Sequence, residues 1–145
     1  MPQLEIPLAE RTLAFVVGLE VSQAPAVASY LKSRGERVPE PVQVRALVDT
    51  GAGVCAATAN LIRRLNLPTK STKRREIMTA GGPIASLEHY GALHLVGLEE
   101  LKVDYATICR FDFTDSPFEF ILGMNVLMRW NWRYSRAGMR LVFEA

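Results

Sequence analysis

Several stretches of this chain alternate apolar and polar residues with the period of two that is typical of half-buried β-strands. The alternation is clearest in Lys102–Ile108. Further stretches rich in strand-forming residues are Leu13–Val21, Pro41–Val48, His89–Val96 and Met139–Phe143. The pattern therefore predicts a mostly β protein.

Two segments break this alternation. Ala56–Leu67 has apolar residues at roughly helical spacing and ends at Pro68, which cannot continue a helix. In Ala24–Glu40, Pro25 suits the first turn of a helix and Gly35 suits its end. We expect a short surface helix or a long loop over 24–40, an insertion whose role the sequence does not indicate.

Composition narrows the class of protein. With 145 residues, 49% of them hydrophobic and 22% charged, the chain 1–145 has the size of a single domain. No apolar run approaches the roughly 20 residues of a membrane helix, so we expect a soluble, cytoplasmic protein without a membrane partner. Cys55 and Cys109 are too few for a disulfide framework, and no histidine stands at a zinc-ligand spacing beside them. We expect free buried thiols, no metal and no cofactor.

The stretch most suggestive of chemistry is Ala46–Ala52, in which an apolar run delivers Asp49, Thr50 and Gly51 into a turn. A carboxylate placed behind a buried strand is costly unless hydrogen-bond donors surround it, and Thr50 and the backbone at Gly51 offer such donors. Asp-Thr-Gly followed by Ala resembles the active-site turn of the aspartic proteases. The short chain resembles their retropepsin-like branch, in which two identical subunits each supply one turn.

A second motif lies about 70 residues further on. In Phe118–Leu127 a buried strand is expected to meet Gly123, after which a short helix carries Val126 and Leu127 inward. This stretch resembles the retropepsin-like segment that packs against the active-site turn and leads into the C-terminal helix. The resemblance implies that the site is structurally supported by Leu122, Gly123 and Asn125. It also implies a single-domain closed β-barrel with one short C-terminal helix, acting as a homodimer whose terminal strands interleave.

Between the two motifs, Glu76–Leu87 has strand-like flanks around the Gly81-Gly82 pair, which is a hairpin signal. The resemblance makes this hairpin the flap that closes over substrate, while an ordinary β-hairpin remains the alternative. In the same way, it makes the early part of Ala56–Leu67 a strand and only Thr58–Leu65 helical. The substrate-binding residues that it implies are Ala52, Thr79, Ala80, Gly81 and Gly82.

Other polar or aromatic stretches have simpler interpretations. The basic run Lys70–Arg75 contains no aromatic residue for base stacking, so a solvated loop is favoured over nucleic-acid binding. Asp112 and Asp115 lie in a connector with an ordinary turn signal and are not expected to be catalytic. Trp130, Trp132 and Tyr134 alternate as residues of a strand and are expected to pack a core or an interface rather than a ligand.

The single Asp-Thr-Gly limits the mechanism. Hydrolysis of a peptide by water without a metal needs a general base and a general acid, and two adjacent carboxyl groups that share one proton supply both. The second carboxyl must come from another copy of the chain, across a two-fold axis. The sequence thus predicts a homodimeric aspartic endopeptidase acting on extended polypeptides, with Asp49, Thr50 and Gly51 as catalytic residues. The alternative is a non-catalytic dimerisation or peptide-binding module on the same fold.

Overall fold

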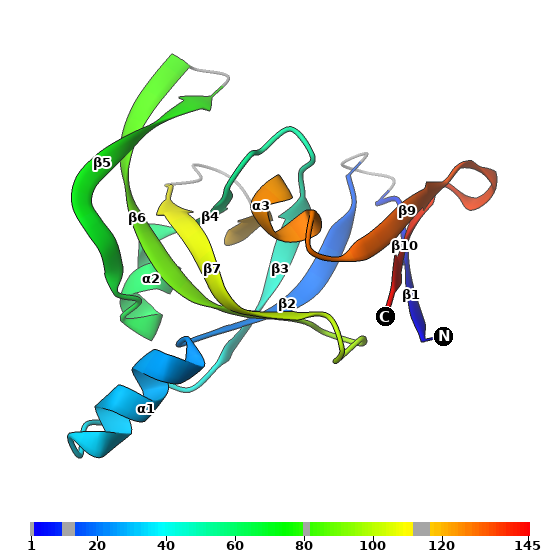
Figure 1. Cartoon of the computed structure of the whole chain (residues 1–145). Helices are drawn as coiled ribbons and strands as arrows, with labels where there is room; N and C mark the ends of the chain where they lie inside the picture. The colour runs from blue at the N-terminus through cyan, green and yellow to red at the C-terminus, as the bar shows by residue number, and fades with distance from the viewer. Residues whose placement is uncertain (1, 10–13, 80–81, 112–116) are drawn as a thin grey trace.

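The computed structural model describes residues 2–9, 14–79, 82–111 and 117–145, and it contains a closed β-barrel (Figure 1). Six strands follow one another around the barrel in the order β2-β3-β8-β4-β7-β6, and a β2–β6 pairing closes it. Their bounds are β2 Val16–Ser22, β3 Val42–Val48, β4 Cys55–Ala57, β6 Gly82–Leu95, β7 Lys102–Arg110 and β8 Phe120–Leu122. The predicted mostly β barrel is therefore confirmed.

The barrel interior is an apolar core to which every one of these strands contributes. In β3 the exposed Gln43 and Arg45 alternate with the buried Val44 and Ala46, because successive side chains of a strand point to opposite faces. The largest fully buried side chains are Phe120, Phe143, Leu19, Leu61, Leu65, Leu93 and Leu95. The alternation read from the sequence thus marked the inward face correctly.

Strand β6 is longer than the sequence pattern indicated. The flank after Gly82 and the stretch His89–Val96 were expected as strands of two separate hairpins, but they form one continuous strand of 14 residues. At Gly91 an added Cβ would lie 2.9 Å from the Ser22 carbonyl oxygen, so the absence of a side chain lets β6 pass close to β2. One strand therefore pairs with β5 (Thr69–Thr79) in one hairpin and with β7 in the next.

The basic run of 70–75 is not a loop, in contrast to our expectation. It belongs to β5, an 11-residue strand that pairs with β6 and extends the sheet beyond the closed barrel. The expected hairpin is present, with Thr79 opposite Gly82, while Ala80 and Gly81 at its tip lie outside the described residues. Figure 1 shows it rising on the same side of the barrel as the loop between β3 and β4.

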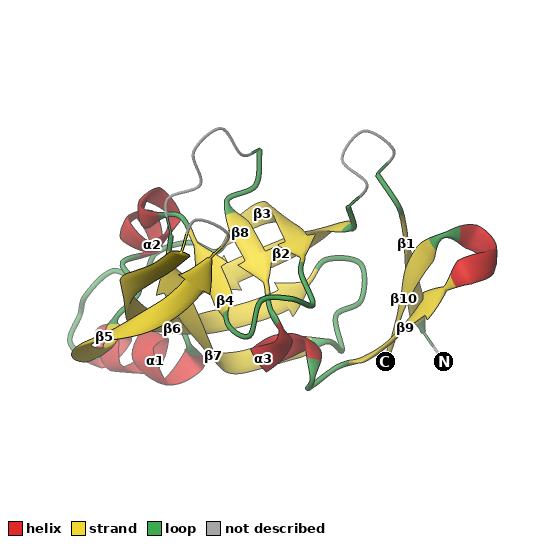
Figure 2. Ribbon diagram, turned by 90° about the horizontal axis from the view of Figure 1, so that it is seen from above, coloured by secondary structure: helices red, strands yellow, loops and turns green. Residues whose placement is uncertain are grey.

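A second, three-stranded sheet joins the two ends of the chain. It has the order β1-β10-β9, with β1 Gln3–Pro7, β9 Asn131–Ser135 and β10 Arg140–Glu144, and Figure 2 shows it beside the barrel. These pairings are made within one chain, and interleaving with a second subunit stays a prediction.

The alternating aromatic residues near this sheet pack as expected at two of three positions. Trp130 is buried edge-on against Phe143, with ring centroids 6.3 Å apart, and Trp132 donates its indole N–H to the Leu127 carbonyl. Tyr134 is half exposed and meets the edge of Phe15.

The helices settle the two ambiguous segments. Helix α1 (Pro25–Ser33) is the surface helix expected within 24–40; it begins at Pro25 and contains no buried residue. Helix α2 (Ala59–Leu65) follows strand β4, as the family resemblance implied, and the Thr58 hydroxyl caps it by accepting the Leu61 N–H. Helix α3 (Met124–Leu127) is the predicted short helix, with Val126 and Leu127 buried, and η1 (Arg136–Gly138) is a single 3-10 turn.

Three remaining sequence-based expectations concern cysteines, acids and membranes. Cys55 and Cys109 are free and buried, as predicted. Asp112 and Asp115 lie outside the described residues. Among the residues that are described, no helix is long and apolar enough to cross a membrane.

Candidate active site

Asp49 stands where strand β3 ends and its neighbour β8 ends beside it. The two strands run parallel, with Val48 opposite Leu122, and the Asp49 N–H donates to the Leu122 carbonyl oxygen at 3.0 Å. This pairing between residues far apart in sequence holds the first residue of the turn against the barrel. The Asp49 side chain itself is half-buried.

The turn after Asp49 folds back on the carboxylate. The Gly51 N–H donates to Asp49 Oδ1 at 2.9 Å, and the Ala52 N–H donates to the Asp49 carbonyl at 3.2 Å. An added Cβ at Gly51 would lie 3.2 Å from Asp49 Oδ1, so a larger residue would crowd the carboxylate. Thr50 is exposed, and within the described part of the chain its hydroxyl makes no hydrogen bond. Of the two expected donors, only Gly51 therefore serves Asp49 within one chain.

The first residues of α3 donate hydrogen bonds to the loop that follows the Asp49 turn. The Met124 N–H donates to the Ala52 carbonyl at 2.7 Å, and the Asn125 N–H donates to the Gly53 carbonyl at 3.1 Å. Gly123 has no room for a side chain, since an added Cβ would lie 2.6 Å from the Val54 carbonyl carbon. The second sequence motif thus lies directly against the first.

Asn125 ties three elements together through its side chain. Its Oδ1 accepts the Cys55 N–H at 2.9 Å, and its Nδ2 donates to the Thr107 carbonyl oxygen at 3.0 Å. Both contacts use the amide as acceptor and donor at once, so a carboxylate in its place would lose the second bond. The amide links α3 to β4 and β7 at the edge of the Asp49 turn.

Two thiols flank the site from different sides. Burial raises the pKa of Cys55 to about 12, although the Gly123 N–H, which donates to its Sγ at 3.2 Å, acts in the opposite direction. Burial also raises the pKa of Cys109, and Glu88 adds to the rise while Arg75 and Lys70 oppose it. Both side chains are therefore neutral thiols near neutral pH.

A cavity of about 600 Å³ opens above Asp49. Its floor is the turn and the loop after it, namely Asp49, Gly51, Ala52, Gly53 and Val54. Its walls are Ala56, Cys109, Phe111 and Ile121 from the barrel, and its far side is Arg75, Glu76, Ile77 and Met78 from β5. The cavity joins an acid, an apolar lining and one strand of the β5–β6 hairpin, and an apolar cavity with a few polar groups is typical of a ligand-binding site.

Sequence reasoning missed the residues of β5 that line this cavity. It placed substrate contacts at Ala52, which lines the cavity, at Thr79 and Gly82, which are paired at the end of the described hairpin, and at Ala80 and Gly81, which lie outside the described residues. The signal that could have found Arg75 and Ile77 was the strand period leading into the hairpin, since residues two apart share a face. The basic composition of 70–75 obscured it.

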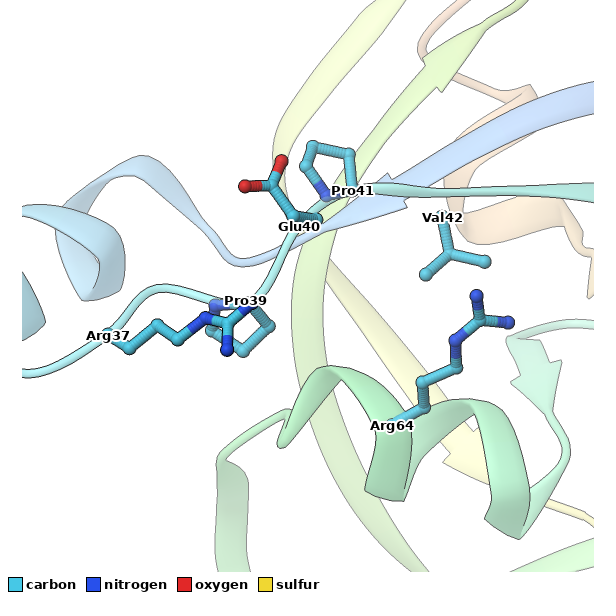
Figure 3. Close-up of a pocket in the computed structure, with 6 residues that line it drawn as sticks. All are labelled: Arg37, Pro39, Glu40, Pro41, Val42 and Arg64. Carbon is cyan, nitrogen blue, oxygen red and sulfur yellow. The ribbon is translucent and has the colours of Figure 1, made fainter.

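A second, smaller cavity of about 350 Å³ lies between the segment after α1 and helix α2 (Figure 3). It is lined by Arg37, Pro39, Glu40, Pro41, Val42 and Arg64 and shares no residue with the cavity at Asp49. Within the described ranges there is also no group of three metal-ligating side chains. The chemistry is therefore best sought at Asp49.

Comparisons with known proteins agree with this placement. A family described as "gag-polyprotein putative aspartyl protease" matches residues 40–129, which include both motifs. The fold is similar to the crystal structure of a retropepsin-like aspartic protease from Rickettsia conorii, with a TM-score of 0.64 and 18% identity over 97% of this chain and 89% of that one. Among curated proteins, none matches the sequence.

Proposed function

Because this chain belongs to the gag-polyprotein aspartyl protease family, a retropepsin-like group, we propose that it is an aspartic endopeptidase that cleaves extended polypeptides as a homodimer. The observation that carries the proposal is the state of Asp49. Its carboxylate is half-buried at the floor of a 600 Å³ cavity, with Oδ1 bound by the Gly51 N–H. A carboxylate oriented by the backbone and open to a cavity is suited to acid–base work on a bound peptide.

The proposed reaction needs Asp49 from each of two copies. Two carboxyl groups within hydrogen-bond reach share one proton, since their charges repel when both are ionised. The ionised group removes a proton from a water molecule as that water attacks the peptide carbonyl carbon. The protonated group donates its proton to the carbonyl oxygen, which gives a tetrahedral intermediate with two hydroxyl groups. The carboxyl group that took the water proton then donates it to the amide nitrogen, while the other carboxylate takes a proton from one of these hydroxyl groups. The C–N bond breaks, the amine leaves, and the pair again shares one proton.

Other residues of the site have supporting roles in this proposal. Thr50, exposed in the single chain, meets its counterpart across the two-fold axis and fixes the plane of the two carboxyl groups. Leu122, Gly123 and Asn125 support the turn from behind. The β5–β6 hairpin closes over the peptide as a flap, which excludes water and supplies backbone hydrogen bonds to an extended substrate.

The test compares Asp49→Asn with the wild-type protein on a denatured protein substrate between about pH 4 and 7. We expect cleavage by the wild type and a loss of at least about 100-fold in Asp49→Asn, since the amide can neither accept nor share the proton. Asp104→Asn is the matched control, because Asp104 is exposed on β7 and lines no part of the Asp49 cavity. Equal cleavage by all three proteins would refute the role of Asp49. Peptide binding without cleavage by the wild type would favour the non-catalytic module.

A further inference from the structure

Arg75 is the cationic residue that lines the Asp49 cavity. It lies on β5 two residues before Ile77, so the two side chains share a face of the strand. Ile77 is half-buried and also lines the cavity. Opposite Arg75 on β6 stands the buried Ser86, whose hydroxyl donates to the Arg110 carbonyl on β7. The strand thus presents Arg75 toward the barrel side of the hairpin.

The guanidinium of Arg75 forms one ion pair, which leaves most of its N–H donors without a partner among the described residues. Its Nη1 lies 3.7 Å from Glu88 Oε2, and the Arg75 side chain is 51% exposed whereas that of Glu88 is 19% exposed. Within the described residues this ion pair is its single polar contact. A guanidinium carries five N–H donors in a planar fork, so most of them remain available to a ligand in the cavity.

Besides Arg75, the charged residues that line the cavity are two acids, Asp49 on its floor and Glu76 on β5. The loop after the Asp49 turn supplies Gly53 and Val54, neither of which can form an ion pair. Glu76 is exposed, and although it is the neighbour of Arg75 in the strand it also lines the cavity. The walls are apolar apart from the neutral Cys109 thiol. Within the described part of the chain, Arg75 is therefore the lining residue that can form an ion pair with an acidic side chain of a substrate, since the other two charged residues would repel it.

We propose that Arg75 is a specificity-determining residue, which binds the carboxylate of a glutamate or aspartate side chain in the peptide substrate. Arg75 takes this carboxylate in a bidentate arrangement with its unused N–H groups, while Glu88 keeps the guanidinium oriented from behind. The inference rests on the proposed peptidase function, since it names the substrate class of that same cavity.

The experiment uses peptide pairs built on a sequence that the wild-type protein cleaves. At each position flanking the scissile bond, one peptide carries Glu and its partner carries Gln, which has the same shape without the charge. We expect one position at which the wild type favours Glu by about 10-fold in kcat/KM, as for a charge-assisted hydrogen bond. In Arg75→Gln this ratio falls to about 1, and in Arg75→Lys it is intermediate because the bidentate fork is lost.

Arg74→Gln is the matched control, because Arg74 is the exposed neighbour on the other face of the same strand and does not line the cavity. The Glu preference must survive in this variant. A wild-type protein without any acidic preference, or one whose preference persists in Arg75→Gln, overturns the proposal.

A binding measurement separates this proposal from the peptidase activity. Fluorescently labelled Glu and Gln peptides are titrated with Asp49→Asn and with Asp49→Asn/Arg75→Gln, and neither protein needs to cleave. Tighter binding of the Glu peptide by the first protein alone supports the subsite even if hydrolysis is absent. Equal binding of both peptides by both proteins refutes the subsite even if hydrolysis is present.

Discussion

The Cys55 thiol lies fully buried behind the Asp49 turn, where its Sγ accepts the Gly123 N–H and its own N–H donates to Asn125 Oδ1. Sequence reasoning treated it as a packing residue, and its burial agrees with that. The hydrogen bonds add a second role, since Cys55 connects strand β4 to Gly123, whose backbone lies directly against Val54. A residue without a reactive role can still position the turn.

Because burial raises the pKa of Cys55 from 9.0 to about 12, the folded state keeps this proton at pH values where the unfolded chain loses it. The unfolded state then binds fewer protons, and the free energy of unfolding falls as pH rises. We expect the Cys55 contribution to decrease by about 1.4 kcal/mol per pH unit above about pH 9. Urea unfolding of the wild type and Cys55→Ala at a series of pH values measures it.

The relevant quantity is the difference between the two proteins, because Cys109, whose pKa is also raised, titrates in both. The stability difference between wild type and Cys55→Ala is expected to be constant near neutral pH and to shift against the wild type in alkaline solution. A difference that is independent of pH up to about pH 11 would contradict the raised pKa of Cys55.

At the scale of elements, α1 is an excursion from a β-hairpin. Strands β2 and β3 are paired up to Val21 opposite Val42, so the segment between them begins and ends at neighbouring points. The helix buries none of its residues. Gln23, just before it, is buried and donates from Nε2 to the carbonyls of Leu65 and Asn66 at the end of α2. Gln23 therefore connects the end of β2 to α2, whereas α1 itself adds no buried residue to the core.

We expect replacement of residues 25–40 by two glycines to leave the barrel folded, with a change in melting temperature of less than about 5 °C. Little apolar burial is lost, and a shorter loop lowers the entropic cost of closure. Gln23→Ala in the full chain is the comparison, and it should destabilise by about 1–3 kcal/mol because the buried Leu65 carbonyl and the part-buried Asn66 carbonyl lose a donor. Thermal unfolding followed by circular dichroism measures both. A shortened protein less stable than Gln23→Ala would assign a structural role to α1.

At the scale of the whole molecule, the proposed active site is complete only in a pair of chains. Each chain provides one Asp49, which is positioned by one turn. A dimer of one wild-type and one Asp49→Asn subunit should therefore be inactive. With free exchange of subunits, an equal amount of Asp49→Asn is expected to reduce wild-type activity to about one half, and a nine-fold excess to about one tenth. Activity assays after co-incubation measure the effect, and Asp104→Asn should cause no loss.

A mixture whose activity is unaffected by Asp49→Asn at any ratio, under conditions where sizing shows mixed dimers, would contradict a shared site. The alternative would then be a site contained within one chain. The test thus bears on the assembly of the site rather than on the identity of the acid.

Some features of this protein are local enough to be determined by sequence. The period of two located several of the strands, although not β1 or the first part of β5. Pro25 marked the start of α1, the family resemblance placed the start of α2 near Thr58, and the two motifs pointed to Asp49 and to Gly123 beside it. Each of these depends on the conformational preferences of a few adjacent residues, or on short patterns typical of one family. The two motifs could be matched as a pair from their order and spacing, and the structure places them side by side on parallel strands.

Other features were decided only by the tertiary structure. Whether the basic run of 70–75 is a loop or a strand depends on pairing with β6, and the continuity of β6 depends on the close approach of β2 at Gly91. The local pattern of a strand shows which of its faces is apolar, but the neighbours of that face come from distant parts of the chain. For this reason the sequence alone pointed to the acid at Asp49, while only the folded barrel placed Arg75 across the same cavity.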